Sequence, residues 1–150
     1  MSIFTDTVTV YNGRSYIENA SPKNKYFRTV LCGVFVKEST HRDVSDQGVS
    51  RHSMSRTITV PVGVDIPSGK TYVDPEMFAA LPMDDENHWT LNPQEGSDGG
   101  DIIVLGECGE EVTEQFTLKM LKERHKTCAV VAVDDNTRQP RLKHWAVTGV

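Results

Sequence analysis

Short segments rich in β-branched and aromatic residues, separated by Gly, Pro and Asn, run through this sequence and predict a fold built mainly from strands. Thr5 to Tyr11 alternates polar residues with Val, which is the two-residue period of a strand with one buried face. Tyr26 to Val36 is a longer segment of the same kind, in which Gly33 indicates a bulge or bend. Arg56 to Val64 resumes the alternation and carries Pro61, as edge strands and strand ends do. Further strands are expected at 88–91, 101–106, 127–133 and 142–147, with turns at 12–13, 67–69 and 95–100.

Helical periodicity is sustained in one place only. Val112, Phe116 and Met120 recur at four-residue spacing, which predicts a short helix over about 112–124. A second short helix can open at Asp74, with that residue as cap and Pro75 at the first helical position. The expected architecture is mainly β: a small β-barrel or sandwich of about six to seven strands with the short helix at 112–124, in a single domain spanning 1–150.

The apolar side of the periodic segments predicts the core. The residues expected to be largely buried are Val8, Val10, Val30, Val34, Ile58, Val60, Ile103, Phe116, Val131 and Trp145. The dipeptide His-Trp occurs twice, at 88–89 and 144–145. Two core anchors are the plainer interpretation of the tryptophans, and a platform on which a ligand stacks is the alternative.

Residues 37–55 are polar and follow neither period, so we expect a long loop there. Its many charged and histidine side chains resist burial, which argues against packing on its own domain. We expect the loop to be mobile in an isolated subunit and to become ordered among neighbouring subunits or next to DNA. Its candidate contact residues are His41, Arg42, Arg51 and His52.

Charge is unevenly distributed along the chain. The net charge of -5 argues against a surface that coats nucleic acid. Residues 71–118 contain 12 Asp or Glu and no Lys or Arg, whereas residues 119–150 contain 7 Lys or Arg and 3 Asp or Glu. Opposed acidic and basic faces would orient a subunit in a ring or stack, although folding could also interleave the segments and cancel the asymmetry.

No motif in the sequence predicts an active site. Cys32, Cys108 and Cys128 are odd in number and form no C-x-x-C pair, which suits reduced thiols in a cytoplasm. The acidic surroundings of Cys108 disfavour a thiolate, and the five histidines show no metal-binding spacing. We therefore expect no catalytic, cofactor-binding or metal-binding residues and no enzymatic activity. The start of the chain has no secretory signal pattern, and no apolar run approaches the ~20 residues that cross a bilayer.

The order of eight segments resembles a known family. They are DTVTVYN, YFRTVLCGV, TITVPV, YVDPEMF, HWTLNP, DIIVLGE, AVVAVDDN and HWAVTG. Together they resemble the small minor-capsid, or head–tail connector, proteins of tailed phages and prophages of Gram-positive bacteria. The similarity spans nearly the whole chain.

The resemblance implies a stopper-like β-barrel subunit of the phage neck, found in the virion and in the host cytoplasm during assembly. Such subunits form a homo-oligomeric ring below the portal or adaptor protein and above the tail or tail terminator, and they retain packaged DNA without sequence-specific contacts. Residues 37–55 would be the loop that projects toward the channel. The alternative function is a cytoplasmic small-barrel binding module in which Trp89 and Trp145 line a groove for a ligand or protein partner.

Overall fold

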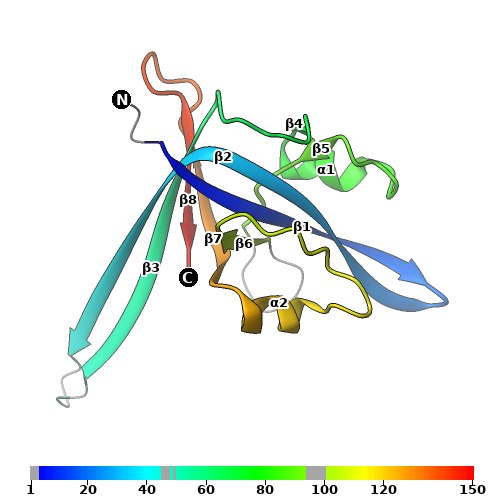
Figure 1. Ribbon diagram of the computed structural model, residues 1–150, viewed down its shortest axis with the longest axis horizontal. Coiled ribbons are helices and arrows are strands. Elements are labelled where there is room, and N and C mark those ends of the chain that lie inside the picture. The colour runs from blue at the N-terminus through cyan, green and yellow to red at the C-terminus, as the bar shows by residue number, and fades with distance from the viewer. Residues whose placement is uncertain (1–3, 45–47, 49, 94–100) are drawn as a thin grey trace.

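Six antiparallel strands close into a barrel in the computed structural model, which describes residues 4–44, 48, 50–93 and 101–150 (Figure 1). The barrel order is β1-β2-β3-β8-β7-β6, and a separate two-stranded parallel sheet joins β4 to β5. The mainly β barrel expected from the sequence is confirmed, with two short helices. The elements are β1 (Asp6–Glu18), β2 (Ser21–Val44), β3 (Ser50–Pro61), β4 (Thr71–Tyr72), α1 (Pro75–Ala80), β5 (His88–Trp89), β6 (Ile102–Leu105), α2 (Leu118–Arg124), β7 (Thr127–Asp135) and β8 (His144–Gly149).

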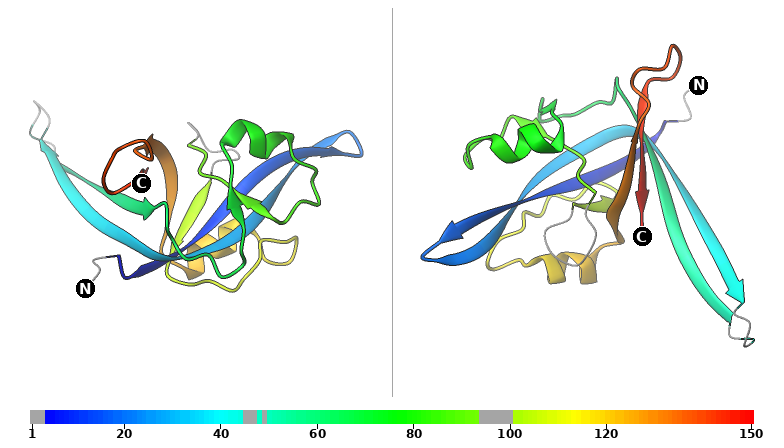
Figure 2. Two further views of the ribbon diagram at one scale, coloured as in Figure 1. Left: turned by 90° about the horizontal axis from the view of Figure 1, so that it is seen from above. Right: turned by 180° about the vertical axis from the view of Figure 1, so that it is seen from behind.

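Two hairpins extend beyond the barrel wall because β1, β2 and β3 are far longer than β6 and β8. The β1–β2 arm, residues 13–25, ends in a two-residue turn at Asn19 and Ala20, whose φ angles of 51° and 61° are those of a type I′ hairpin turn. The β2–β3 arm comprises residues 37–44 and 50–55, whose antiparallel pairs run from Ser39↔Ser55 to Val44↔Ser50. The arms leave the barrel in different directions in every view (Figures 1 and 2).

Two sequence expectations about these arms are wrong. The chain does not turn at 12–13, because the Asn12 side chain is used in buried hydrogen bonds to Thr90 and Asp101 and β1 continues straight. Residues 37–44 and 50–55 do not form a loop, because cross-strand pairing in the hairpin satisfies the backbone without any need for apolar alternation. The expected turn at 95–100 lies outside the described residues.

Bulges shape the barrel where the register shifts. At Gly33, with φ of 92°, β2 carries one extra residue opposite the Asp6–Thr7 step of β1, as the sequence predicted. At Val131, β7 carries an extra residue opposite β8, which leaves the Val131 side chain 41% exposed. The expectation that Val131 is buried is therefore wrong. Val30 and Phe116 are half-buried, and the other predicted core residues are buried.

Apolar side chains form two clusters, one inside the barrel and one outside it. The interior cluster includes Val8, Val34, Ile58 and Trp145. The other lies where α2 covers the outer face of β1 and β6, and it consists of Tyr11, Ile102, Val104, Cys108 and Leu121. Strand β6 is consequently buried on both faces.

Both helices begin at capping residues that the sequence supplies. Asp74 accepts a hydrogen bond from the Met77 N–H at 2.8 Å and Pro75 follows it, so α1 begins where the sequence predicted. Thr117 caps α2 by accepting from the Met120 N–H at 3.4 Å. The predicted helix over 112–124 is therefore confirmed only from Leu118 onward, because residues 113–116 form a turn in which the Phe116 N–H bonds the Thr113 hydroxyl. In the described part of the chain, neither helix is long and apolar enough to cross a membrane.

Candidate functional site

The β2–β3 arm carries the residues that the sequence marked as contacts. Strand pairing places the backbone of Arg42 opposite His52, with the pairs His41↔Ser53 and Asp43↔Arg51 on either side. The hairpin thus gathers all four candidates at its outer half. The side chains of His41, Arg42, Arg51 and His52 lie outside the described part of the structure.

An ion-pair cluster fixes the arm to the barrel at its base. The Glu38 carboxylate contacts Arg56 Nε at 3.2 Å and Lys126 Nζ at 2.7 Å. Hydrogen bonds from Lys126 and Arg56 hold the pKa of Glu38 below its usual value. Arg56 is itself buried and also donates to the Thr127 carbonyl, at the start of β7. The cluster joins β2, β3 and β7, so it sets the direction in which the arm leaves the barrel.

The open edges of the arms have the features of an assembly surface. Within the described ranges, the outer part of each arm pairs only with its own hairpin partner, so its other edges have no strand neighbour. Large apolar side chains on the arms are exposed: Ile17 at 79%, Val44 at 61% and Met54 at 46%. Unpaired strand edges with exposed apolar residues are templates for pairing with another chain.

The two tryptophans come together at one end of the barrel. The rings of Trp89 and Trp145 meet at 6.0 Å between centroids, and Tyr72 lies 4.4 Å from Trp145. Trp89 and Trp145 are both buried, which confirms their role as core anchors. Beside them is a hollow of about 360 Å³, whose lining includes Val62, Val64 and Ile66.

A buried carboxyl ties the segment before β6 to β1. Asp101 is 1% exposed and accepts hydrogen bonds from Asn12 Nδ2 at 2.8 Å, the Gly13 N–H at 3.1 Å and the Asn92 N–H at 2.7 Å. Burial raises the pKa of Asp101 to about 7, against the opposing effect of these three donors. The group fixes the path of the chain as it enters β6.

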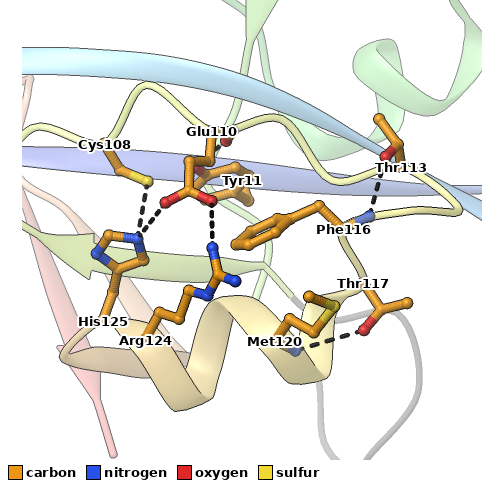
Figure 3. Close-up of polar contacts among 9 residues, drawn as sticks. All are labelled: Tyr11, Cys108, Glu110, Thr113, Phe116, Thr117, Met120, Arg124 and His125. Atoms are coloured by element: carbon orange, nitrogen blue, oxygen red, sulfur yellow. Dashed lines mark hydrogen bonds and ion pairs between the residues drawn. The ribbon is translucent and has the colours of Figure 1, made fainter.

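A cysteine, a glutamate and a histidine converge beside α2, as Figure 3 shows. Cys108 Sγ lies 3.6 Å from His125 Nε2, and Glu110 Oε1 lies 3.1 Å from the same nitrogen. The three ligand atoms lie within 4.8 Å of one another. Cys108 is buried, whereas His125 and Glu110 are partly exposed. Arg124 contacts the second carboxylate oxygen of Glu110 at 3.6 Å.

Sequence reasoning missed this cluster, which we call the Cys-Glu-His cluster. The search for metal ligands looked for paired histidines, and Cys108 and His125 are separated by the whole connection between β6 and β7. The one available signal was a Cys-x-Glu pattern followed by a histidine at the end of a predicted helix. Because that pattern specifies no geometry, only the fold shows that the three side chains meet.

The fold and these surfaces define a small closed antiparallel barrel that carries two hairpin arms. The chain belongs to the family of unknown function DUF6751, whose model matches residues 3–150. Neither a curated protein nor a solved structure matches the chain.

Proposed function

We propose that the protein is a non-enzymatic structural subunit of the phage neck, a head-closure or connector ring that joins the DNA-filled head to the tail and helps to retain DNA. The observation that carries the proposal is the β2–β3 arm, which continues a barrel strand pair outward with open edges and exposed apolar side chains. An isolated two-stranded hairpin is marginally stable in water, so a partner that pairs with it would stabilise the arm. The simplest such partner is another copy of the chain, because it presents the same unpaired strand edges.

Ring assembly also accounts for the firm base of the arm. A flexible tether would place the arm tip anywhere, whereas the contacts among Glu38, Arg56 and Lys126 hold it in one direction relative to the barrel. A fixed direction is what a head-to-tail interface requires if it is to close into a ring of defined size. In the ring, His41, Arg42, Arg51 and His52 would face the neighbouring subunit or the DNA channel.

The uneven charge distribution supports docking of partner proteins in a fixed orientation. Exposed carboxylates cluster around α1 at Asp74, Glu76, Asp84 and Glu86, and the β7–β8 loop exposes Arg138, Arg141 and Lys143. The acidic segment is partly neutralised by pairs such as Arg28–Glu111 and Arg124–Glu110, but α1 is not among the segments so paired in the described residues. Patches of opposite sign would orient the portal or adaptor protein and the tail protein that dock on the ring.

The test shortens the arm without disturbing the barrel. Thr40 and Met54 are register partners, so an Asn-Gly turn that replaces residues 41–53 closes the hairpin at that pair. The matched control shortens the other arm: Tyr16 and Lys23 are partners, and an Asn-Gly turn replaces residues 17–22. Both variants are purified for measurements in solution. Each is also used to complement a phage that encodes a chain of this family and from which that gene has been deleted.

We expect the variant lacking 41–53 to keep its unfolding midpoint, to lose concentration-dependent assembly in sedimentation velocity, and to leave DNA-filled heads and finished tails unjoined. If each of the two variants supports the formation of joined, infectious particles, the neck proposal is wrong. If the 41–53 variant unfolds several degrees earlier while assembly is unchanged, the arm supports the subunit and not the ring.

A binding module is the second candidate function, and the hollow beside Trp89 and Trp145 favours it. Aromatic and aliphatic walls of this kind suit a flat apolar ligand or an apolar side chain of a partner. Ligand binding there would change tryptophan fluorescence in the full-length protein, and Tyr72→Ala would weaken that change. A protein whose fluorescence responds to a ligand but that never assembles would favour this function over the ring.

A further inference from the structure

Two distances in the Cys-Glu-His cluster match edges of a zinc coordination tetrahedron. Zinc binds thiolate sulfur at about 2.3 Å and imidazole nitrogen or carboxylate oxygen at about 2.0–2.1 Å, so a tetrahedral angle separates sulfur from nitrogen by about 3.6 Å and nitrogen from oxygen by about 3.3 Å. The observed separations are 3.6 Å between Cys108 Sγ and His125 Nε2, and 3.1 Å between His125 Nε2 and Glu110 Oε1. Cys108 and Glu110 therefore each lie at ligand spacing from His125, and all three ligand atoms lie within 4.8 Å of one another.

The arrangement is that of a metal site and not of a catalytic triad. In a cysteine–histidine–acid triad the thiol and the acid contact opposite nitrogens of the imidazole, so that the acid orients the base. Here Cys108 and Glu110 both contact Nε2. One ring nitrogen offers one lone pair or one proton, and it cannot bond both groups well. A cation placed among the three atoms satisfies all of them at once.

The fold holds each ligand in place before any ion binds. Cys108 is fixed by its N–H bond to Thr9 Oγ1 at 2.9 Å, and Tyr11 Oη donates to the Glu110 carbonyl at 2.6 Å. Both anchors lie on β1, in the barrel wall. His125 ends α2, where its N–H bonds the Leu121 carbonyl at 3.0 Å. The start of the connection between β6 and β7 is thus held against the barrel beside the cluster.

The chemical types of the three ligands limit which metal ion the cluster can bind. Ca²⁺ and Mg²⁺ take oxygen ligands, whereas a thiolate with an imidazole and a carboxylate suits a softer divalent ion such as Zn²⁺. A thiolate and a carboxylate carry two negative charges that Zn²⁺ neutralises. His125 and Glu110 retain 29% and 39% of their side-chain exposure, which leaves an entry path and room for a water molecule as the fourth ligand.

We propose that Cys108, Glu110 and His125 bind one Zn²⁺ ion, and that the ion fastens the β6–β7 connection, including α2, to the barrel. Arg124 supports the site by holding the second oxygen of the Glu110 carboxylate, which leaves Oε1 directed at the ion. The proposal is independent of the neck function, because the cluster lies beside α2 and the arms are formed by β1, β2 and β3.

The test titrates untagged, chelator-treated, reduced full-length protein with Co²⁺ and then with Zn²⁺. We expect one Co²⁺ per chain, with a thiolate-to-cobalt charge-transfer band and the visible bands of tetrahedral cobalt, both removed by one equivalent of Zn²⁺. Zinc should also slow hydrogen exchange across residues 107–126.

Variants separate the site from incidental binding. His125→Gln changes a partly exposed residue, so the protein should fold as judged by circular dichroism, and its affinity for Zn²⁺ should fall at least about tenfold. Glu110→Gln should weaken binding less, and Cys108→Ser should remove the charge-transfer band. His144→Gln and Cys32→Ser serve as matched controls and should bind like the parent. No stoichiometric binding, or equal affinity in folded His125→Gln, would overturn the proposal.

Discussion

The Arg14 guanidinium lies over two aromatic rings that contact each other, 5.3 Å from the centroid of Phe78 on α1 and 5.7 Å from that of Phe27 on β2. The same group donates to carbonyls at the end of α1: to Pro82 at 3.0 Å, to Ala79 at 3.3 Å and to Leu81. Arg14 is 8% exposed. A positive charge at the C-terminal end of a helix is favourable, and the guanidinium donates to carbonyls in the last turn of α1 and just beyond it. Arg14 therefore attaches α1 to the β1–β2 arm.

Replacing Arg14 by Ala should release this attachment. We expect the free energy of unfolding to fall by about 2–4 kcal/mol, because buried hydrogen bonds from a charged group and two ring contacts are lost together. The free energy of unfolding of Arg14→Lys should lie between those of Arg14→Ala and the parent, since an ammonium keeps the charge but cannot span three carbonyls. Urea unfolding measures the change, and hydrogen exchange should show lost protection at residues 75–83.

Lys25 provides the control for this prediction. It also approaches Phe27, at 5.0 Å, and donates to the Met83 carbonyl, but it is exposed. Lys25→Ala should change the free energy of unfolding by less than about 0.5 kcal/mol. Equal losses in the two variants would mean that the general positive charge of the arm, and not the buried Arg14 contact, holds α1.

Trp145→Ala should cost about 3–5 kcal/mol, the range for large aromatic truncations in a core. The ring contacts Tyr72 and Trp89 and closes the barrel interior at the hollow. Chemical denaturation of the variant measures this loss, and Val131→Ala, at a 41% exposed bulge position, should lose far less. An unchanged melting midpoint for Trp145→Ala would show that the residue is peripheral.

Local sequence patterns were enough to predict the mainly β class, the Gly33 bulge and the start of α1, because each depends on neighbouring residues. The arms could not be predicted in this way. Residues 37–44 and 50–55 extend beyond the barrel wall, and periodicity detects a strand only through a face that is buried against a core. The expected turn at 12–13 was wrong for a related reason. The Asn12 amide is of a type that forms local turns, but its hydrogen-bond partners Thr90 and Asp101 lie far along the chain.

The candidate sites show the same limit. Trp89 and Trp145 were recognised individually as core anchors, yet their contact depends on β5 and β8 meeting in three dimensions. The Cys-Glu-His cluster depends on the connection after β6 folding back along β1, which Thr9 and Tyr11 direct through hydrogen bonds to residues about a hundred positions away. No local pattern encodes such a path.

Gly149 should be intolerant of any side chain. A Cβ placed there would lie 2.6 Å from Cys128 Sγ and 3.0 Å from Cys128 Cβ. Gly149→Ala should therefore destabilise the protein by about 1–3 kcal/mol through overpacking of the β7–β8 contact. In a Cys128→Ala background the sulfur is absent, so the additional loss from Gly149→Ala should be clearly smaller. A double-mutant cycle by urea unfolding measures the coupling, and additive losses would contradict this steric account.

Asp101 should make the protein more stable as the pH falls from 8 to 5.5. Burial raises the pKa of its carboxyl to about 7 in the folded chain, whereas the unfolded chain keeps a value near 3.8. Between these values the folded state binds a proton that the unfolded state does not, so stability is present at low pH and is lost as the pH rises toward 7. At about 1.4 kcal/mol per pH unit, the expected gain from pH 8 to 5.5 is about 2 kcal/mol. Urea unfolding across this range gives the profile.

Asp101→Asn isolates this contribution, because the amide has no titration to lose. Every other titratable group is present in both proteins, so the difference between the two profiles reports Asp101 alone. Glu38, Asp85 and Asp135, whose pKa values are lowered by hydrogen bonds, change protonation below the window. The variant profile should therefore be flatter by about 2 kcal/mol from pH 8 to 5.5. Parallel profiles would mean that the donors Asn12, Gly13 and Asn92 outweigh burial and keep the carboxylate ionised throughout.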